Sequence, residues 1–94
     1  MKRSKELNLF IQKNSRLFWF IPPERILGIS DEILVETILN YGDKDDFTRL
    51  VRLMGINKVA RLFFDSINSS ERKKGNYSEI TINYFSHVFS KYAH

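Results

Sequence analysis

The five residues at positions 17–21, Leu-Phe-Trp-Phe-Ile, are all apolar and are followed at once by Pro22 and Pro23. A regular helix or strand cannot turn five consecutive side chains toward one side, so in either conformation some of them face water. The prolines also disfavour a helical conformation for the residue before each of them. Two interpretations follow. Either the rings anchor an irregular segment across a helical core, or part of the run stays exposed for a partner.

The chain is short, and its composition indicates one domain with a substantial core. Of its 94 residues, 43% are hydrophobic and 14% are aromatic, which argues against disorder. Cysteine is absent, so disulfide bonds and thiolate zinc sites are excluded. No stretch approaches the ~20 apolar residues of a membrane span, and the N-terminus lacks the unbroken apolar run of a signal peptide. We therefore expect a soluble, cytoplasmic protein without membrane association.

Residues typical of helix starts and stops recur along the chain, whereas strand patterns are almost absent. We expect an all-α fold, a single compact domain of four to five short helices preceded by an extended aromatic and proline segment. Residues 1–15 would form a basic N-terminal helix or arm, and residues 16–94 the helical domain. The first helix is expected at residues 4–14. Residues 21–29, IPPERILGI, are expected to form an extended linker in which Pro23 can begin a short turn.

Capping residues locate the next two helices. Ser30 is the expected N-cap of the first, and Gly42 is the expected left-handed residue after its C-terminus. Asp43 then begins another helix, with Asp46 three residues later in a capping box. Gly55 is expected to end that helix.

Two further helices are expected in the C-terminal half. Asn57 is the expected cap of the first, residues 68–76 form a polar and basic loop, and Ser78 begins the second. Apolar residues at helical spacing define the expected buried stripe of this last helix. They are Ile80, Tyr84, Phe85, Val88 and Tyr92.

The net charge of +4 is unevenly distributed. Residues 1–25 carry six basic and two acidic side chains, residues 26–48 one and six, and residues 49–94 eight and three. Basic flanks around an acidic centre suit a charged protein partner or self-complementary folding. A dedicated nucleic-acid binder usually concentrates a basic face without such an acidic centre, so this distribution does not favour nucleic acid.

The sequence offers no convincing catalytic or metal-binding constellation. General acid–base catalysis needs a titratable side chain held beside a partner, and His87 has no acid near it in sequence. The acidic residues Asp43, Asp45 and Asp46 lack the alternate oxygen ligands, the glycine and the distant glutamate of a calcium loop. Helix capping and compensation of the helix dipole explain them better. We therefore expect no enzyme activity, no cofactor and no metal site.

The helices on either side of Gly55 have some features of a DNA-reading helix-turn-helix. Arg49 and Arg52 lie three residues apart, as do Lys58 and Arg61, so each pair shares a helical face. The spacing departs from the motif, because Arg61 stands where an apolar residue is expected. These four residues are the candidate nucleic-acid contacts, and phosphate contact without base reading is the favoured form.

Several short motifs follow one another in a recognisable order. They are Leu17-Phe18-Trp19, Pro22, Tyr41-Gly42-Asp43, Asp46-Phe47 with Leu50, Met54-Gly55, and YSEITINYF at residues 77–85. This order resembles a small bacterial helical domain of unknown function that is often encoded beside AbiEii-type nucleotidyltransferase toxins. The likeness covers about residues 16–90. Phe20 stands where that family has Asp, and Phe47 where it often has Trp, so any role of the missing acid is lost or moved here.

The resemblance implies a helical accessory protein, the antitoxin-like partner of a nucleotidyltransferase-type toxin. Together with the residue patterns it predicts a non-catalytic protein-binding module, in which aromatic residues supply apolar contact and acidic residues meet a basic partner surface. The expected contact residues are Phe18, Trp19, Phe20, Asp43, Asp45 and Asp46. Two alternatives stay open. One is a small DNA-binding regulator that uses the four basic residues, and the other is a homodimer with no further partner.

Overall fold

The computed structural model describes residues 4–93, so the predicted basic start at Lys2 and Arg3 and the terminal His94 lie outside the described residues. The α-helices are α1 (Lys5–Lys13), α2 (Asp31–Tyr41), α3 (Lys44–Met54), α4 (Ile56–Ser69), α5 (Glu71–Lys74) and α6 (Glu79–Tyr92). Two 3-10 helices, η1 (Ser15–Phe18) and η2 (Pro23–Gly28), lie between α1 and α2. Residues 4–93 contain no strand, which confirms the all-α prediction, although the helices outnumber the four to five expected.

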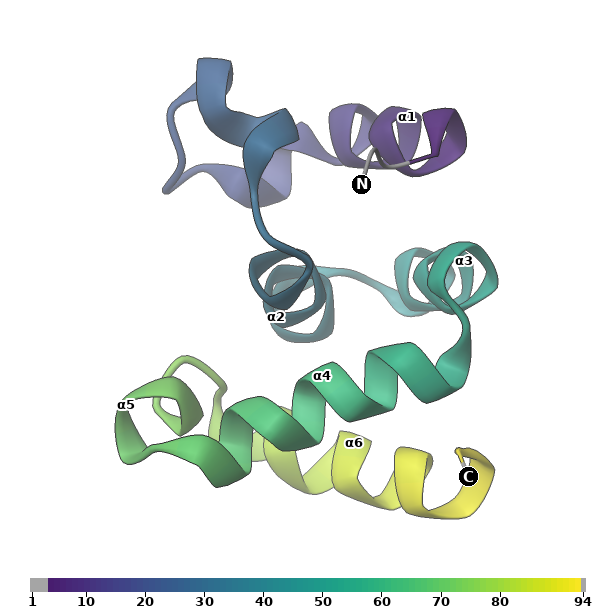
Figure 1. The fold of residues 1–94 in the computed structure, drawn as a ribbon, viewed down its shortest axis with the longest axis vertical. Helices are drawn as coiled ribbons and strands as arrows, with labels where there is room; N and C mark the ends of the chain where they lie inside the picture. Colours follow the sequence, from purple (N-terminus) through teal and green to yellow (C-terminus); the bar gives the residue numbers. More distant parts are fainter. Residues whose placement is uncertain (1–3, 94) are drawn as a thin grey trace.

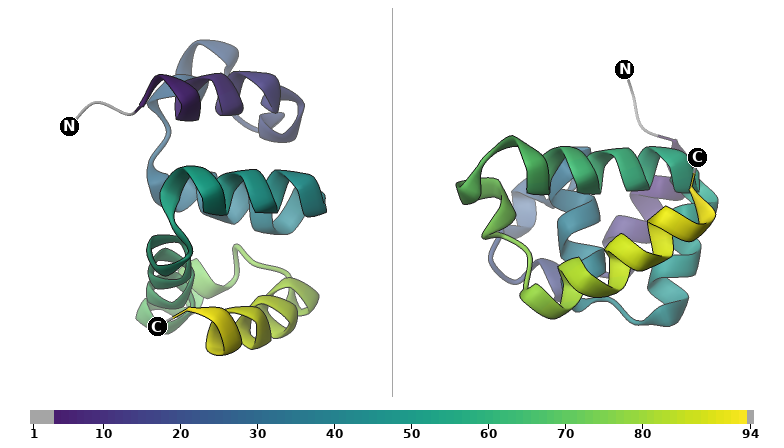
Figure 2. Two further views of the ribbon diagram at one scale, coloured as in Figure 1. Left: turned by 90° about the vertical axis from the view of Figure 1, so that its right-hand side faces the viewer. Right: turned by 90° about the horizontal axis from the view of Figure 1, so that it is seen from below.

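The helices are arranged in three levels (Figure 1). One level holds α1, η1 and η2, the next holds α2 and α3, and the last holds α4, α5 and α6. The left view of Figure 2 shows the same levels after a quarter turn, with α6 beside α4 in the last of them. The whole has principal extents of 32 × 26 × 26 Å.

Side-chain caps begin the helices where the sequence predicts them. The hydroxyls of Ser30 and Ser78 each accept a hydrogen bond of 3.1 Å from the backbone N–H three residues later. Asp43 and Asp46 form the predicted capping box, in which the Asp46 N–H donates to the Asp43 carboxylate at 2.8 Å. The Asp43 N–H donates to the Asp46 carboxylate at 3.0 Å. These bonds satisfy N–H groups that have no partner within the helix.

The predictions at the glycines were partly wrong. Gly55 does end α3, with a φ of +88° that favours glycine, but α4 begins directly at Ile56, so Asn57 is not its cap. Gly42 has a φ of −76° and is not left-handed. A side chain at this position would place its Cβ 2.8 Å from the carbonyl oxygen of Ile38. Close packing therefore requires glycine here.

Two segments expected to be a linker and a loop contain helical turns, and the first of these begins at Pro23, where the sequence allowed a short turn. Within residues 21–29, Pro23 begins η2, because its fixed φ suits the first residue of a helix even though its ring disfavours helix for the residue before it. Within residues 68–76, Ser70 caps the single turn of α5 by accepting a hydrogen bond from the Lys73 N–H at 3.1 Å. Turns of this length are too short to show a hydrophobic period in the sequence.

A single apolar core joins the three levels. Leu7, Phe10 and Ile11 of α1 belong to the same cluster as the buried residues of α2, α4 and α6, so residues 4–15 are part of the domain rather than an arm beside it. Seven large hydrophobic side chains are almost completely buried: Ile11, Phe18, Leu34, Ile38, Leu50, Phe63 and Phe89.

The predicted buried face of α6 was wrong by about one residue. The residues it buries are Thr81, Phe85 and Phe89. Of the expected stripe, Phe85 is buried and Val88 is half-buried, but Ile80, Tyr84 and Tyr92 are 81%, 62% and 59% exposed. The helix has apolar residues on both sides, so periodicity alone leaves two candidate faces. Packing of the Phe89 ring 5.4 Å from the Phe63 ring selects one of them.

Polar side chains of α2 hold the connection between α5 and α6. The Asn40 amide donates to the carbonyl of Asn76 at 2.9 Å and accepts from the N–H of Ser78 at 3.2 Å. Glu32 pairs with Lys73 at 3.4 Å. Between these contacts Tyr77 is buried, and burial together with the nearby Glu36 carboxylate raises the pKa of its phenol.

Glu36 lies in the same region and makes stability depend on pH. Burial raises the pKa of its carboxyl above 4.5, a hydrogen bond from Asn76 opposes the rise, and the charge of Glu32 adds to it. Because the folded pKa exceeds the unfolded one, the stability contributed by Glu36 is complete below the unfolded pKa and is lost as pH rises through the folded pKa. We therefore expect Glu36→Gln to raise the melting temperature at about pH 7, and to raise it less at about pH 4.

Thermal unfolding followed by circular dichroism at both pH values measures this effect. Glu24→Gln, on the exposed η2, is the matched control and should show no such difference. A loss of stability in Glu36→Gln at neutral pH would contradict the prediction, because it would mean that the ionised carboxylate stabilises the fold.

Candidate protein-binding surface

The run at residues 17–21 divides into buried and exposed members. Phe18 is 1% exposed, Leu17 and Ile21 are half-buried, and Trp19 and Phe20 are 75% and 44% exposed. The backbone explains the division. The Ile21 N–H donates to the Phe18 carbonyl at 2.9 Å, so Trp19 and Phe20 are the two central residues of a turn. The run therefore has both an anchored member, Phe18, and an exposed part, Trp19 and Phe20.

Trp19 and Phe20 form a compact exposed pair, which we call the aromatic tip. Their ring centroids are 5.4 Å apart and the rings meet edge to face, an arrangement that aromatic pairs favour. Immediately behind the tip, Phe18 anchors η1, which contacts both α2 and η2. The rings of the aromatic tip are thus displayed on a segment that the core holds in place.

Phe18 must be removed from the predicted contact residues. Its side chain belongs to the core and has almost no accessible surface, so a partner cannot reach it while the domain is folded. The sequence could not distinguish it from its neighbours, because three consecutive aromatic residues have similar burial preferences.

Basic residues predominate in the sequence on either side of the aromatic tip. Three exposed basic residues lie within seven positions of the tip in sequence: Lys13, Arg16 and Arg25. Glu24 is the one acidic residue in the same stretch. The apolar surface of the tip is therefore accompanied by positive charge. Aromatic and arginine side chains in this combination are typical of binding hot spots.

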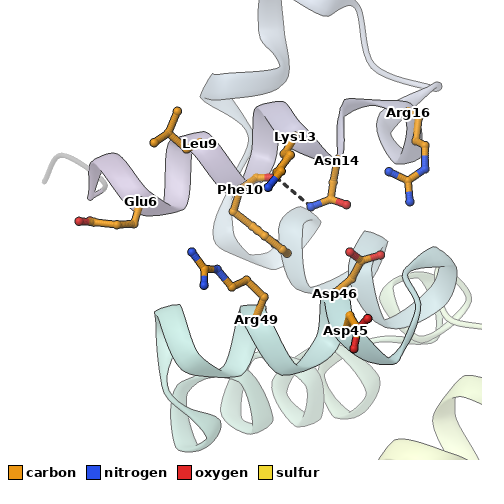
Figure 3. A pocket seen from close by; sticks show the side chains of 9 residues that line it. All are labelled: Glu6, Leu9, Phe10, Lys13, Asn14, Arg16, Asp45, Asp46 and Arg49. Carbon is orange, nitrogen blue, oxygen red and sulfur yellow. Dashed lines mark hydrogen bonds between the residues drawn. The ribbon is translucent and has the colours of Figure 1, made fainter.

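A groove of about 720 Å³ lies between α1, η1 and α3, and we call it the charged groove (Figure 3). Arg49 and Asp46 point from α3 toward α1, and Arg16 points from η1 toward the side on which Asp45 and Asp46 lie. Six charged side chains line the groove: Glu6, Lys13, Arg16, Asp45, Asp46 and Arg49. Among the residues that the structure describes, no ion pair joins any two of these six.

The charged groove includes two residues that sequence reasoning did not single out. Glu6 and Lys13 lie seven residues apart on α1, which is two helical turns, and so share a face of that helix. This spacing was visible in the sequence. What the sequence does not show is that α3 faces the same side. Asn14 closes the end of α1 there by donating from its side chain to the Phe10 carbonyl at 3.0 Å.

The three predicted acidic contacts have different roles. Asp43 and Asp46 are engaged in the capping box of α3, although Asp46 also lines the charged groove. Asp45 is exposed, lines the same groove and takes no part in the capping box. It is therefore the member of the acidic group that is most available to a partner.

The four predicted nucleic-acid contacts are not brought together in one hollow. Arg49 lines the charged groove beside Asp45 and Asp46, whose carboxylates would repel a phosphate. Lys58 and Arg61 line another hollow, of about 530 Å³, between α4 and α6. Lys58 also pairs with Asp31 at 3.2 Å, and Arg52 is exposed but lines neither hollow.

The link between α3 and α4 also differs from that of a helix-turn-helix. Gly55 alone separates the two helices, whereas the turn of that motif typically has about 3–4 residues. The two helices on either side of Gly55 are therefore joined too closely to match the geometry of the motif.

The residues that the structure describes give little support to a catalytic, metal-binding or membrane-spanning role. His87 is exposed on α6. Within residues 4–93, no group of three or more histidine, cysteine or acidic side chains comes close enough together to hold a metal ion. In the same part of the chain, none of the helices has the length and apolar character needed to cross a membrane.

Comparison with family models, with curated proteins and with solved structures finds no match to this chain.

Proposed function

We propose that this chain is a non-catalytic protein-binding module that binds its partner through the aromatic tip. The observation that carries the proposal is the 75% exposure of Trp19, directly after a fully buried Phe18. An exposed tryptophan on an anchored turn loses little conformational freedom when a partner covers it, and its large ring gives a substantial gain of buried apolar surface.

The charged groove supplies the electrostatic part of the same surface. Arg16 links the two features, because it lies three residues before Trp19 and lines the groove. Across the groove, Asp45 is an exposed acid that a basic partner side chain can approach. Charges in such positions chiefly govern the association rate and the orientation of the partner.

For the partner itself we propose a nucleotidyltransferase-type toxin, toward which the chain acts as an antitoxin. The support is the resemblance of the ordered motifs at residues 16–90 to a domain often encoded beside AbiEii-type toxins. One residue of the aromatic tip lies within these motifs, because Trp19 completes the LFW sequence, whereas Phe20 stands where that family has Asp.

Isothermal titration calorimetry with an AbiEii-type nucleotidyltransferase toxin tests the proposal. Trp19→Ala is expected to weaken binding by about 30-fold or more, the loss that is typical of a hot-spot residue. Tyr92→Ala is the matched control, because Tyr92 is an aromatic residue with 59% exposure at the other end of the chain, and its affinity should not change.

Three results would contradict the proposal. The first is the absence of binding by the unmodified chain, and the second is an equal loss of affinity in both variants. The third is binding to arbitrary duplex DNA that falls steeply with salt, since counterion release produces that slope. This last result would instead support the regulator that uses Arg49, Arg52, Lys58 and Arg61.

A further inference from the structure

A second apolar surface lies on the other side of the domain from η1 and involves the first half of α6. Ile80 is the most exposed large hydrophobic residue of the described chain, at 81%, and Tyr84, one turn later, is 62% exposed. Both border a hollow of about 310 Å³ between α6 and the junction of α2 and α3, which we call the α6 hollow. Sequence reasoning placed these two side chains in the core.

The α6 hollow has an apolar floor. Ile38, Leu39 and Phe85 are buried and line it, and the half-buried Phe47 ring packs 5.0 Å from the Phe85 ring. Its volume is at the lower limit of the roughly 300–1,000 Å³ of small-molecule sites. The α6 hollow is therefore suited to receive a protruding apolar side chain.

The same surface carries a protruding apolar side chain of its own. Ile80 stands at the edge of the α6 hollow with four-fifths of its surface in water. A two-fold axis places the same patch of two identical chains face to face, so that each contributes both a protrusion and a recess. The surface thus has the shape that an isologous contact requires.

Charge at the rim is self-complementary as well. Asp43 and Lys44 are neighbours, both exposed, and both line the α6 hollow. Within the described residues, neither takes part in an ion pair, although one oxygen of the Asp43 carboxylate accepts the capping-box hydrogen bond from the Asp46 N–H. A partner of one charge would satisfy only one of them, whereas a second copy related by a two-fold axis supplies an opposite charge to each.

We propose that the α6 hollow binds a second copy of this chain, with Ile80 of each copy entering the α6 hollow of the other. Lys44 of each copy then faces Asp43 of the other across the rim. The inference goes beyond the proposed function and uses a different surface. Trp19 and Phe20 do not line the α6 hollow, so the aromatic tip remains available to a different protein.

Sedimentation equilibrium of the full chain tests the proposal. The unmodified chain, with a mass of 11.2 kDa, is expected to form a dimer, and Ile80→Asp to raise the dimer dissociation constant by about 30-fold or more. Because Ile80 is so exposed, circular dichroism should show an unchanged fold in this variant. Trp19→Ser removes an equally exposed apolar side chain from the aromatic tip and should leave the dimer intact.

A charge variant checks the rim separately. Lys44 is the first residue of α3, where the helix dipole interacts favourably with an acidic side chain. Lys44→Glu should therefore fold at least as stably as the unmodified chain. The same variant should weaken the dimer, because the new carboxylate would face Asp43 of the other copy. A monomeric unmodified chain would overturn the proposal, as would a dimer that survives Ile80→Asp or one that dissociates in Trp19→Ser. Toxin binding by the aromatic tip is tested separately, by calorimetry with Trp19→Ala.

Discussion

Replacing Phe18 by alanine is expected to lower the free energy of unfolding by about 3–5 kcal/mol, the range for a buried phenylalanine whose removal leaves a cavity. Phe18 is 1% exposed and holds η1 in the core cluster, against α2 and η2. A domain of this size is typically stable by only about 5–15 kcal/mol. The loss would therefore remove a large share of its stability. Urea denaturation followed by far-ultraviolet circular dichroism measures it.

The adjacent position provides the control. Trp19→Ala removes a larger ring, but that ring is 75% exposed, so the free energy of unfolding should change by no more than about 0.5 kcal/mol. The two substitutions are at adjacent positions, but their expected effects on the free energy of unfolding differ by several kcal/mol. Equal losses would contradict the division of residues 17–21 into an anchored member and an exposed tip.

Local chemistry accounts for what the sequence predicted well. Ser30, Asp43 with Asp46, and Ser78 cap helices because their side-chain oxygens accept from backbone N–H groups only three residues away. Such contacts do not depend on the remainder of the fold. The positive φ of Gly55 is likewise a local requirement of the tight link between α3 and α4.

The features that the sequence did not predict depend on contacts between distant segments. Ser78 fixes the start of α6, but not which of its two apolar sides faces α4. That choice is made by rings from other helices, such as Phe47 and Phe63, which pack against Phe85 and Phe89. Gly42 differs, because a side chain there would meet the Ile38 carbonyl and the Asp46 Cβ, each only four residues away.

For the candidate sites, the sequence indicated individual residues but not the hollows that several helices form together. Three of the expected contact residues, Trp19, Phe20 and Asp45, are exposed. The sequence left open whether the rings at residues 17–21 anchor the core or stay exposed, because neighbouring aromatic residues have similar burial preferences. The charged groove and the α6 hollow were not expected. Each is formed by two or three helices, and no single segment contains its pattern.

The choice of buried face on α6 leads to the other large expected effect. Phe89→Ala should lower the free energy of unfolding by about 3–5 kcal/mol. Phe89 is 1% exposed, and its ring lies 5.4 Å from that of Phe63, 5.6 Å from that of Phe85 and 6.1 Å from that of Phe47. Removing it would leave rings from three helices without their common contact, and a rigid aromatic cluster cannot readily collapse to fill the space.

Tyr92→Ala is the control for this experiment, because it removes an aromatic ring from the same helix that is 59% exposed and borders neither the charged groove nor the α6 hollow. Its expected change is no more than about 0.5 kcal/mol. Chemical denaturation at matched protein concentration compares the two, so that self-association at the α6 hollow affects both equally. If Tyr92→Ala proved the more damaging variant, α6 would have to be rotated toward the face that the sequence first indicated. Ile80 and Tyr84 would then belong to the core, and the surface proposed for a second copy would not exist.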